Sequence, residues 1–355
     1  MVYFRLFFLS VLLTCLPGNA TKCGCKSMRA CYRSMLRDLR SGGEEACVEN
    51  VPVSTATVTV FLHALYKYCG KVIQVKKSGV TYVGRTLYEV VINGSSWGNS
   101  SKSVTVIDAG QDASEAPVGF ALYLIEQLVA CMEYQKMIDH IRWVILPSTN
   151  PDGMEYSRAK HEYWKKNTRL INNLSYGVDI TRNFEVAWAD CSAANNSFSQ
   201  DYPGHQANSE NETIFIRNTI QKYSESTKAY VSLRRDGHGI FYPFANENSS
   251  NNGTETAKEV AGYVASKVNQ EIFLHLFQND SIFNANTKPH CGHSVDYVFK
   301  TFAVPYAFEM RMFVESSNEI TSKFHRMPRG YGSSLTAKYF AGIKELYRHI
   351  RKTTE

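Results

Sequence analysis

Long apolar runs are scarce in this chain of 355 residues. One such run lies near the start, from Leu6 to Leu16, and no second stretch of about 18 or more apolar residues follows it. The sequence therefore predicts no membrane-spanning segment in the mature protein. It also contains no internal repeat, so a repeat architecture is not expected.

A concentrated positive charge is also lacking. The formal net charge is +6, and basic residues cluster only briefly, at 29–40 and 71–77. No long basic stripe with interleaved aromatic residues accompanies these clusters, so nucleic acid is not an expected partner. With 44% hydrophobic and 20% charged residues, the composition is that of a globular protein.

The start of the chain has the composition of a secretory signal peptide. Arg5 precedes the apolar run, and small residues suited to signal-peptide cleavage follow it at 18–20. We therefore expect residues 1–20 to be removed and the mature protein to be soluble, secreted and extracellular. A cysteine-rich lead, residues 21–54, comes next, and the main domain spans residues 55–355.

Nine cysteines are present, of which Cys15 falls within the predicted signal peptide. The even number that remains predicts disulfides in an oxidising compartment, but their pairing cannot be deduced from the sequence. A metal site at Cys23 and Cys25 is a less favoured alternative, because zinc-binding pairs usually have two or more residues between the thiolates. N-glycans on exposed loops are predicted at the N-x-S/T sequons of Asn93, Asn99, Asn173, Asn195, Asn211, Asn248, Asn252 and Asn279.

Apolar spacing predicts alternating strands and helices after residue 54. Strands are expected at 71–75, 82–92, 104–109, 141–147, 230–233 and 306–311, and helices at 58–68, 116–134, 209–223 and 334–351. Strands that alternate with longer helices indicate an α/β fold with a mixed or largely parallel sheet covered on both faces. The low-complexity segment 246–256 is expected to be a glycosylated loop.

An acidic pair marks the end of one predicted central strand. In VIDAGQDASEAPVG, residues 106–119, Asp112 and Glu115 are three residues apart and no histidine accompanies them. Open α/β sheets bind ligands at the carboxyl ends of their strands, which makes this pair a candidate for a site. The residues alone also permit a simpler interpretation, since carboxylates are favourable near the positive end of the following helix dipole.

Several motifs then occur in a characteristic order. They are NPDGMEY at 150–156, WKKN at 164–167, GVDITRNF at 177–184, and YPG at 202–204 with ANSE at 207–210. With these motifs the chain resembles the zinc metallocarboxypeptidases, in their carboxypeptidase A and B branch, over roughly residues 55–351. The resemblance implies a three-layer α/β/α sandwich around a mixed, mostly parallel sheet of about eight strands.

The resemblance also implies a zinc site whose ligands are substituted here. In the family, a His-x-x-Glu pair and a second histidine hold the metal, and these positions fall on Asp112, Glu115 and Arg234. An aspartate can coordinate zinc, whereas a guanidinium stays protonated and has no lone pair to offer. We therefore expect no zinc cofactor, and we expect Arg234 to pair with the two carboxylates in the space of the metal.

Other family positions are retained in part. By resemblance, the general base falls on Glu309 and the arginine that polarises the scissile carbonyl falls on Lys165, and both are expected to be vestigial. The pair that grips a substrate's C-terminal carboxylate falls on Thr181 and Arg182. The residue that sets side-chain preference falls on Val295, which is apolar as in the A-type enzymes. Counting back from Ser294 places the family's mobile tyrosine near Lys288.

The residues alone also support structural interpretations. Glu309 at a strand end suits an ion pair with Arg311 on the same face, and Arg182 suits a structural salt bridge. His238, His290 and His293 lie close enough in sequence to suggest a metal cluster, but ligation by loop histidines is the less favoured interpretation.

Three functions follow from these observations. The leading hypothesis is a secreted, glycosylated, catalytically inactive carboxypeptidase-like protein that binds peptide or protein C-termini. The alternative is an active zinc metallocarboxypeptidase of A-type preference that uses Asp112, Glu115 and His238 as ligands. The third is a purely interacting or structural secreted protein whose cleft has no role.

Overall fold

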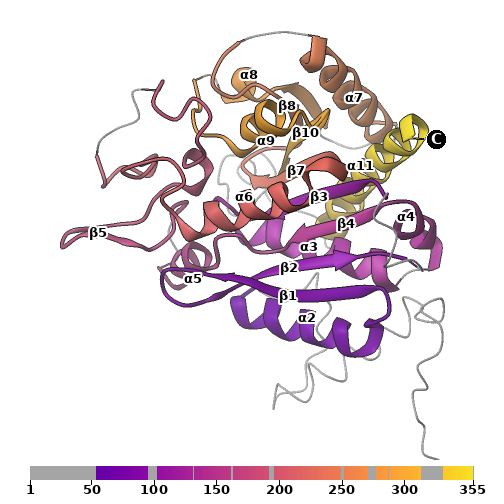
Figure 1. Ribbon diagram of the computed structural model, residues 1–355, viewed down its shortest axis with the longest axis horizontal. Helices are drawn as coiled ribbons and strands as arrows, with labels where there is room; N and C mark the ends of the chain where they lie inside the picture. Colours follow the sequence, from indigo (N-terminus) through magenta and orange to yellow (C-terminus); the bar gives the residue numbers. More distant parts are fainter. Residues whose placement is uncertain are drawn as a thin grey trace, which may run out of the picture.

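The computed structural model describes residues 53–94, 102–130, 132–160, 163–191, 196–248, 252–270, 277–286, 288–312 and 331–354 (Figure 1). The predicted signal peptide and almost all of the cysteine-rich lead lie outside these residues, as do Asn99 and Asn195.

The centre of the molecule is an eight-stranded sheet in the order β1-β2-β4-β3-β7-β10-β8-β9. Its strands are β1 (Ile73–Val80), β2 (Thr86–Ile92), β3 (Val104–Ala109), β4 (Arg142–Leu146), β7 (Thr227–Arg235), β8 (Gly239–Tyr242), β9 (Gln278–Ser281) and β10 (Tyr306–Met312). The neighbours β4, β3, β7 and β10 are parallel, whereas β1, β2 and β8 introduce antiparallel pairs. Because the four parallel strands end at one edge, the residues that follow them meet there.

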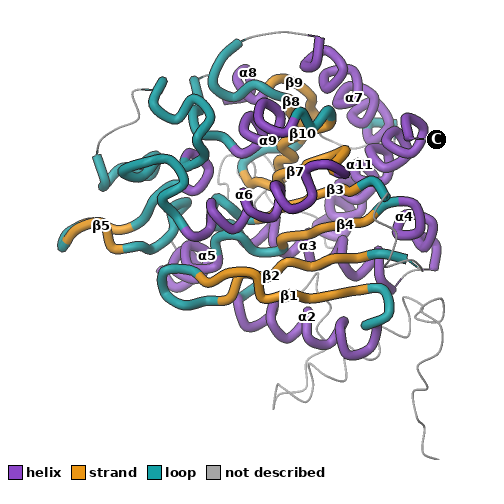
Figure 2. The backbone as a smooth tube through the Cα atoms, in the orientation of Figure 1, coloured by secondary structure: helices purple, strands orange, loops and turns teal. Residues whose placement is uncertain are grey.

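Helices cover both faces of this sheet (Figure 2). One hydrophobic cluster joins a sheet face to α2 (Thr55–Cys69), α3 (Glu115–Ala130), α4 (Gln135–His140), α7 (Asn252–Val268) and α11 (Tyr331–Thr354). The second cluster joins the opposite face to α6 (Asn211–Tyr223) and α9 (Ser294–Phe302). The predicted three-layer α/β/α sandwich with a mixed, mostly parallel sheet is therefore confirmed.

The strand composition explains which elements become central. All six residues of β3 are buried, and the β-branched Val104, Val106 and Ile107 are among them. Side chains alternate along a strand, so Val106 packs in the second cluster and Ile107 in the first. A continuous apolar run of this kind is typical of a parallel strand covered on both faces.

Some elements differ from the prediction. The low-complexity segment 246–256, expected to be a loop, includes the first turn of α7. The rest of α7 was not predicted either, nor were α4, β8, β9, α5 (Pro151–Lys160), α8 (Ile282–Asn286), α9 and the small β5–β6 hairpin (Leu170–Asn172 and Ser175–Tyr176). Most of these elements are short or polar, so their apolar periodicity is weak, but α7 and α9 have apolar positions that were not read as helices.

Two predictions about the surface can be compared with the structure. Asn93 was expected to be exposed as a glycosylation site, but it is fully buried, and its Oδ1 accepts a hydrogen bond from Lys102 Nζ at 2.7 Å. Asn173, Asn211, Asn248 and Asn279 are exposed. Among the described helices, none is long and apolar enough to cross a membrane.

Glu212, near the start of α6, is a buried acid with an unusual environment. Its Oε2 accepts a hydrogen bond from Asn167 at 3.3 Å, whereas its Oε1 has no hydrogen-bond partner among the described residues. Burial raises the pKa of Glu212 to about 8, and the neighbouring Glu210 and Asp152 carboxylates add to this rise. The native state therefore holds a proton that an unfolded chain loses near its ordinary value of 4.5.

The Glu212→Gln substitution should stabilise the protein, mostly at alkaline pH. Because the folded pKa is raised, the stability of the parent should fall as pH rises from about 4.5 to about 8 and then level off. A glutamine cannot ionise, so the gain should be small at pH 5 and of the order of 2–4 kcal/mol at pH 8.5. Chemical unfolding at both pH values measures this gain in stability, and Glu225→Gln, at an exposed position, is the control. A gain that is equal at both pH values would contradict the assignment.

Candidate ligand-binding site

A cavity of about 290 Å³ lies beyond the carboxyl ends of β3, β7 and β10. Charged groups dominate its walls. Six cationic side chains line it, namely Lys165, Arg182, Arg234, Arg235, Lys288 and Arg311, together with four carboxylates, Asp112, Asp201, Asp236 and Glu309. The site predicted at the carboxyl edge of the sheet is therefore a highly polar pocket.

Arg234, near the end of β7, is 4% exposed and is held by neutral oxygens. Its Nε donates to Ser232 Oγ at 2.8 Å, and its Nη2 donates to Gln111 Oε1 at 2.9 Å and to Ser294 Oγ at 3.0 Å. The expected ion pairs of Arg234 with Asp112 and Glu115 are not formed. The guanidinium is instead oriented by hydroxyl and amide groups of three different segments.

Asp108 lies behind these groups and completes a buried polar network. Its carboxylate accepts hydrogen bonds from Gln111 Nε2 at 2.8 Å, from Ser232 Oγ at 3.2 Å and from the Tyr230 hydroxyl. Burial raises the pKa of Asp108, and the charge of Arg234 opposes that rise. Asp108, Gln111 and Ser294 were not predicted from the sequence. A polar residue within an otherwise apolar strand was a signal for Asp108, and one just after the strand was a signal for Gln111.

Asp112 and Glu115 point to different surroundings. Asp112 is buried, its Oδ2 accepts a hydrogen bond from the Arg235 backbone N–H at 2.8 Å, and its Oδ1 has no partner among the described residues. Burial raises its pKa, and Arg235 opposes the rise. Glu115 is the first residue of α3 and does not line the cavity. Burial also raises the pKa of Glu115, with Arg158 as its main opposing charge. The helix-entry interpretation therefore describes Glu115.

His238 is turned away from the acidic pair. Its Nδ1 lies 3.2 Å from the Tyr339 hydroxyl, and its ring packs edge-on against Phe277 and Tyr339. The structure thus does not bring together Asp112, Glu115 and His238. Within the part of the chain that the structure describes, no group of three or more His, Cys, Asp or Glu residues could hold a metal ion.

Glu309, on β10, has both oxygens occupied. His293 Nδ1 accepts the Val295 backbone N–H at 3.2 Å, so its Nε2 carries the proton and donates to Glu309 Oε2 at 2.7 Å. Arg311 Nε binds Glu309 Oε1. Burial would raise the pKa of Glu309, but Arg311 and His293 together hold it well below its usual value. The interpretation of Glu309 as an ion-pair partner of Arg311 is confirmed.

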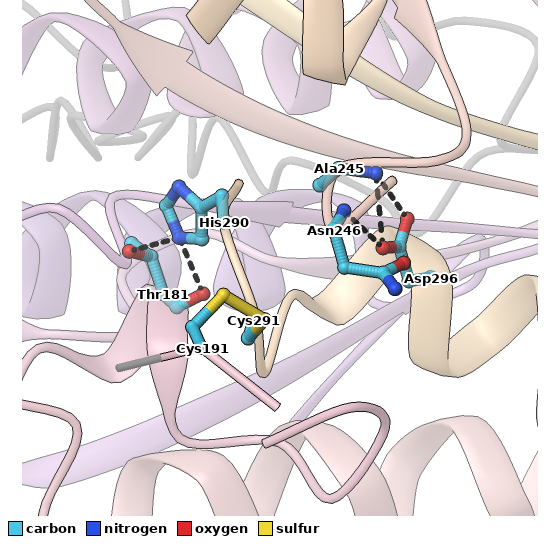
Figure 3. Close-up of a disulfide and its surroundings, with 7 residues drawn as sticks. All are labelled: Thr181, Cys191, Ala245, Asn246, His290, Cys291 and Asp296. Carbon is cyan, nitrogen blue, oxygen red and sulfur yellow. Dashed lines mark hydrogen bonds between the residues drawn. A yellow bond between two sulfur atoms is a disulfide. The ribbon is translucent and has the colours of Figure 1, made fainter. Parts of the chain in front are cut away.

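Thr181 and Arg182 line a second wall of the cavity, and Figure 3 shows Thr181 with its partner His290. Thr181 Oγ1 donates to Asp179 Oδ1 at 2.6 Å, and His290 Nε2 donates to the Thr181 carbonyl at 3.0 Å. Arg182 Nε lies 3.3 Å from Asp179, which also forms an ion pair with Lys165 at 3.4 Å. The predicted salt bridge of Arg182 is confirmed, and its two terminal amino groups, which make no hydrogen bond to the described residues, belong to a side chain that lines the cavity.

Val295 does not face this cavity. Its side chain is fully buried in the second hydrophobic cluster, on the inner side of α9. The expectation that Val295 provides an apolar wall for a ligand therefore needs correction. The cavity wall is charged, because α9 contributes its apolar face to the core rather than to the pocket. Lys288, in contrast, is exposed and lines the cavity.

Asn150 and Asn183, from two of the sequence motifs, mainly position the loops that form the cavity walls. Asn150 Nδ2 donates to the Gln111 carbonyl at 3.0 Å, and its Oδ1 accepts the Gly153 N–H at 3.0 Å. Asn183 Nδ2 donates to the Pro203 carbonyl at 2.8 Å, and its Oδ1 accepts the Glu210 N–H. These side-chain to backbone bonds connect loops that are far apart in sequence.

A disulfide fastens the Arg182 wall to the segment before α9. Cys191 is bonded to Cys291, 100 residues later, and Cys291 directly follows His290 (Figure 3). The prediction of disulfides is confirmed for Cys191 and Cys291.

Asp296, in the first turn of α9, accepts hydrogen bonds from the Ala245 and Asn246 backbone.

Comparisons with known proteins agree with this architecture. A family model described as zinc carboxypeptidase matches residues 58–330. "Zinc carboxypeptidase A 1" of Drosophila melanogaster is 27% identical over 256 residues, 70% of this chain and 59% of the relative. Human "Carboxypeptidase A6" is 26% identical over 259 residues, 71% of this chain and 58% of the relative. The chain thus spans less than two thirds of these relatives.

Solved structures show the same fold. The crystal structure of carboxypeptidase A from Helicoverpa armigera has a TM-score of 0.77 at 21% identity, covering 91% of this chain and 79% of its own. Bovine thrombin-activatable fibrinolysis inhibitor, in complex with tick carboxypeptidase inhibitor, has a TM-score of 0.76 at 19% identity. The match covers 86% of this chain and 100% of the solved one.

Proposed function

Because the chain belongs to the zinc carboxypeptidase family, we propose that it uses the family's cleft to bind peptide C-termini without hydrolysing them. The observation that carries this proposal is Arg182. Its guanidinium borders the cavity, it approaches Asp179 and Asp201 most closely through Nε, and a planar fork of N–H donors can bind a free carboxylate through two hydrogen bonds.

The residues at the family's metal positions do not fit zinc. By resemblance these positions are Asp112, Glu115 and Arg234, of which Glu115 faces away from the cavity and Arg234 is a buried cation. A zinc ion needs three protein ligands with lone pairs in a catalytic site, and a guanidinium supplies none. We therefore derive no catalytic step that passes through a metal.

The family's general base is also compromised in this chain. Glu309 matches its position, but His293 and Arg311 occupy both of its oxygens and lower its pKa. A general base works best when its pKa is near the working pH and when it can reach the proton that it removes. The same contacts make Glu309 a good structural counter-ion for the cations beside it.

The setting of this function is extracellular in our proposal. The predicted signal peptide, residues 1–20, would direct the chain to secretion, where the Cys191–Cys291 disulfide is stable. N-glycans are proposed at the exposed sequons of Asn173, Asn211, Asn248 and Asn279. The partner would then be a peptide or protein C-terminus in the extracellular space.

Calorimetry with matched ligands tests the proposed function. A short peptide with a free C-terminal carboxylate should bind at least ten times more tightly than the same peptide as its C-terminal amide, because only the acid pairs with Arg182. The preference should weaken as salt is increased. Equal affinity for acid and amide would show that the cavity does not recognise a carboxylate.

A further inference from the structure

Two cations lie side by side at the inner end of the cavity. Arg234 on β7 and Arg311 on β10 are register partners of neighbouring parallel strands. Like charges in such positions destabilise a sheet unless an anion separates them. Glu309 binds Arg311 directly, and Arg234 forms no ion pair with any of the described residues.

Arg234 has donors left over. Its Nε and Nη2 bind Ser232, Gln111 and Ser294, whereas its Nη1 makes no hydrogen bond to the described residues although the side chain is 96% buried and lines the cavity. Asp108, on the far side of the Gln111 and Ser232 side chains, already accepts three hydrogen bonds and does not contact the guanidinium. The free edge of a buried cation therefore faces the cavity.

None of the described carboxylates forms an ion pair with Arg234, although its charge acts on Asp108, Asp112 and Glu309. Asp201 and Asp236 are the exposed members, with side chains 54% and 44% accessible, and they bind Lys165 and the Tyr163 hydroxyl near the mouth. Glu309 is occupied, and Asp112 uses its Oδ2 for the Arg235 backbone, whereas its buried Oδ1 has no partner among the described residues. Inside the mouth, Nη1 of Arg234 is thus a donor without a partner, and Asp112 Oδ1 is an acceptor without one, again among the described residues.

From this arrangement we propose that Arg234 forms a second anion-binding subsite, and that the cavity takes a ligand with two carboxylates. The first would bind Arg182 and the second the Nη1 edge of Arg234. The inference rests on the proposed carboxylate binding at Arg182. A cavity of about 290 Å³ holds the volume of roughly ten water molecules, which is enough for one acidic residue at a peptide C-terminus. The ligand class is therefore peptides that end in glutamate or aspartate.

Four peptides that are identical except at their C-terminus test this subsite by calorimetry. Two end in glutamate and two in glutamine, and each is used as the free acid and as the C-terminal amide. With the parent protein, the Glu-ended acid should bind at least ten times more tightly than the Gln-ended acid, which has the same shape but lacks the second charge. Arg234→Gln should remove this difference and keep the preference for acid over amide. Arg158→Gln, an exposed arginine on α5 that pairs with Glu155, is the control. Free glutarate shows whether a dicarboxylate alone is sufficient.

The outcomes separate the two proposals. Equal affinity for Glu-ended and Gln-ended acids, with weaker amides, overturns the second subsite and leaves carboxylate binding intact. Equal affinity for all four peptides overturns both. If glutarate binds as tightly as the Glu-ended acid, the subsite is supported but its ligand is a free dicarboxylate. Should Arg234→Gln fail to fold, the comparison of peptides on the parent protein decides alone.

Discussion

Replacing Cys191 and Cys291 by serine is expected to lower the free energy of unfolding by about 4 kcal/mol. The two cysteines are 100 residues apart, and a cross-link of that span removes much of the conformational freedom of the unfolded chain. The melting temperature should fall by roughly 6–10 °C. Chemical unfolding of the parent and of the double variant measures the loss.

The two single variants provide the control for this prediction. Cys191→Ser and Cys291→Ser each break the same bond, so each alone should cost about as much as the pair. If the loss came from local packing around two independent side chains, the single effects would add up to the double effect. Additive losses, or a double variant as stable as the parent, would contradict the assignment of the cross-link as the cause.

Arg182→Gln should abolish the preference for a free C-terminal carboxylate. Charge-assisted hydrogen bonds are each worth about 1.5–3 kcal/mol, so acid and amide peptides should differ by less than about twofold in the variant. Arg182→Lys should retain part of the preference, because it keeps the charge but loses the fork. Lys165 and the Thr181 hydroxyl still contact Asp179, so the wall should remain folded.

Arg348→Gln is a suitable control for Arg182→Gln, since Arg348 is exposed on α11 and pairs with Glu345. Calorimetry and thermal melts should show the parent's affinity and stability in this control. A carboxylate preference that survives Arg182→Gln unchanged would place the recognition elsewhere in the cavity, with Lys165 and Lys288 as the next cations to replace.

The sequence predicted the sheet better than the site. Runs such as 104–109 are mostly apolar, rich in β-branched residues and fully buried, so their role as parallel strands follows from composition. The motifs at 150–156 and 177–184 identified the family and thereby the three layers. Short or polar elements such as β8 and β9 depend on tertiary pairing, of β8 with β10 and of β9 with β8, which a local pattern does not reveal.

The site residues were found, but their partners were not. Arg234, Asp112 and Glu309 were predicted from their positions in the sequence, and all three line one cavity. The directions of the side chains were not predicted, because Gln111 and Ser294 hold Arg234 and because Glu115 does not line the cavity. Side-chain direction depends on neighbours from distant segments, so sequence spacing could not determine it. The buried position of Val295 has the same origin.

Mass spectrometry of the peptide recovered from a saturated complex tests whether the cavity binds peptides without cleaving them. The protein is incubated for hours with a Glu-ended peptide in the presence of zinc, unbound peptide is removed, and the bound fraction is released and weighed. Our account predicts that the peptide is bound and has its full mass. A bound or released peptide shortened by its last residue, with cleavage prevented by a chelator, would show that the protein is an active carboxypeptidase and would contradict the account.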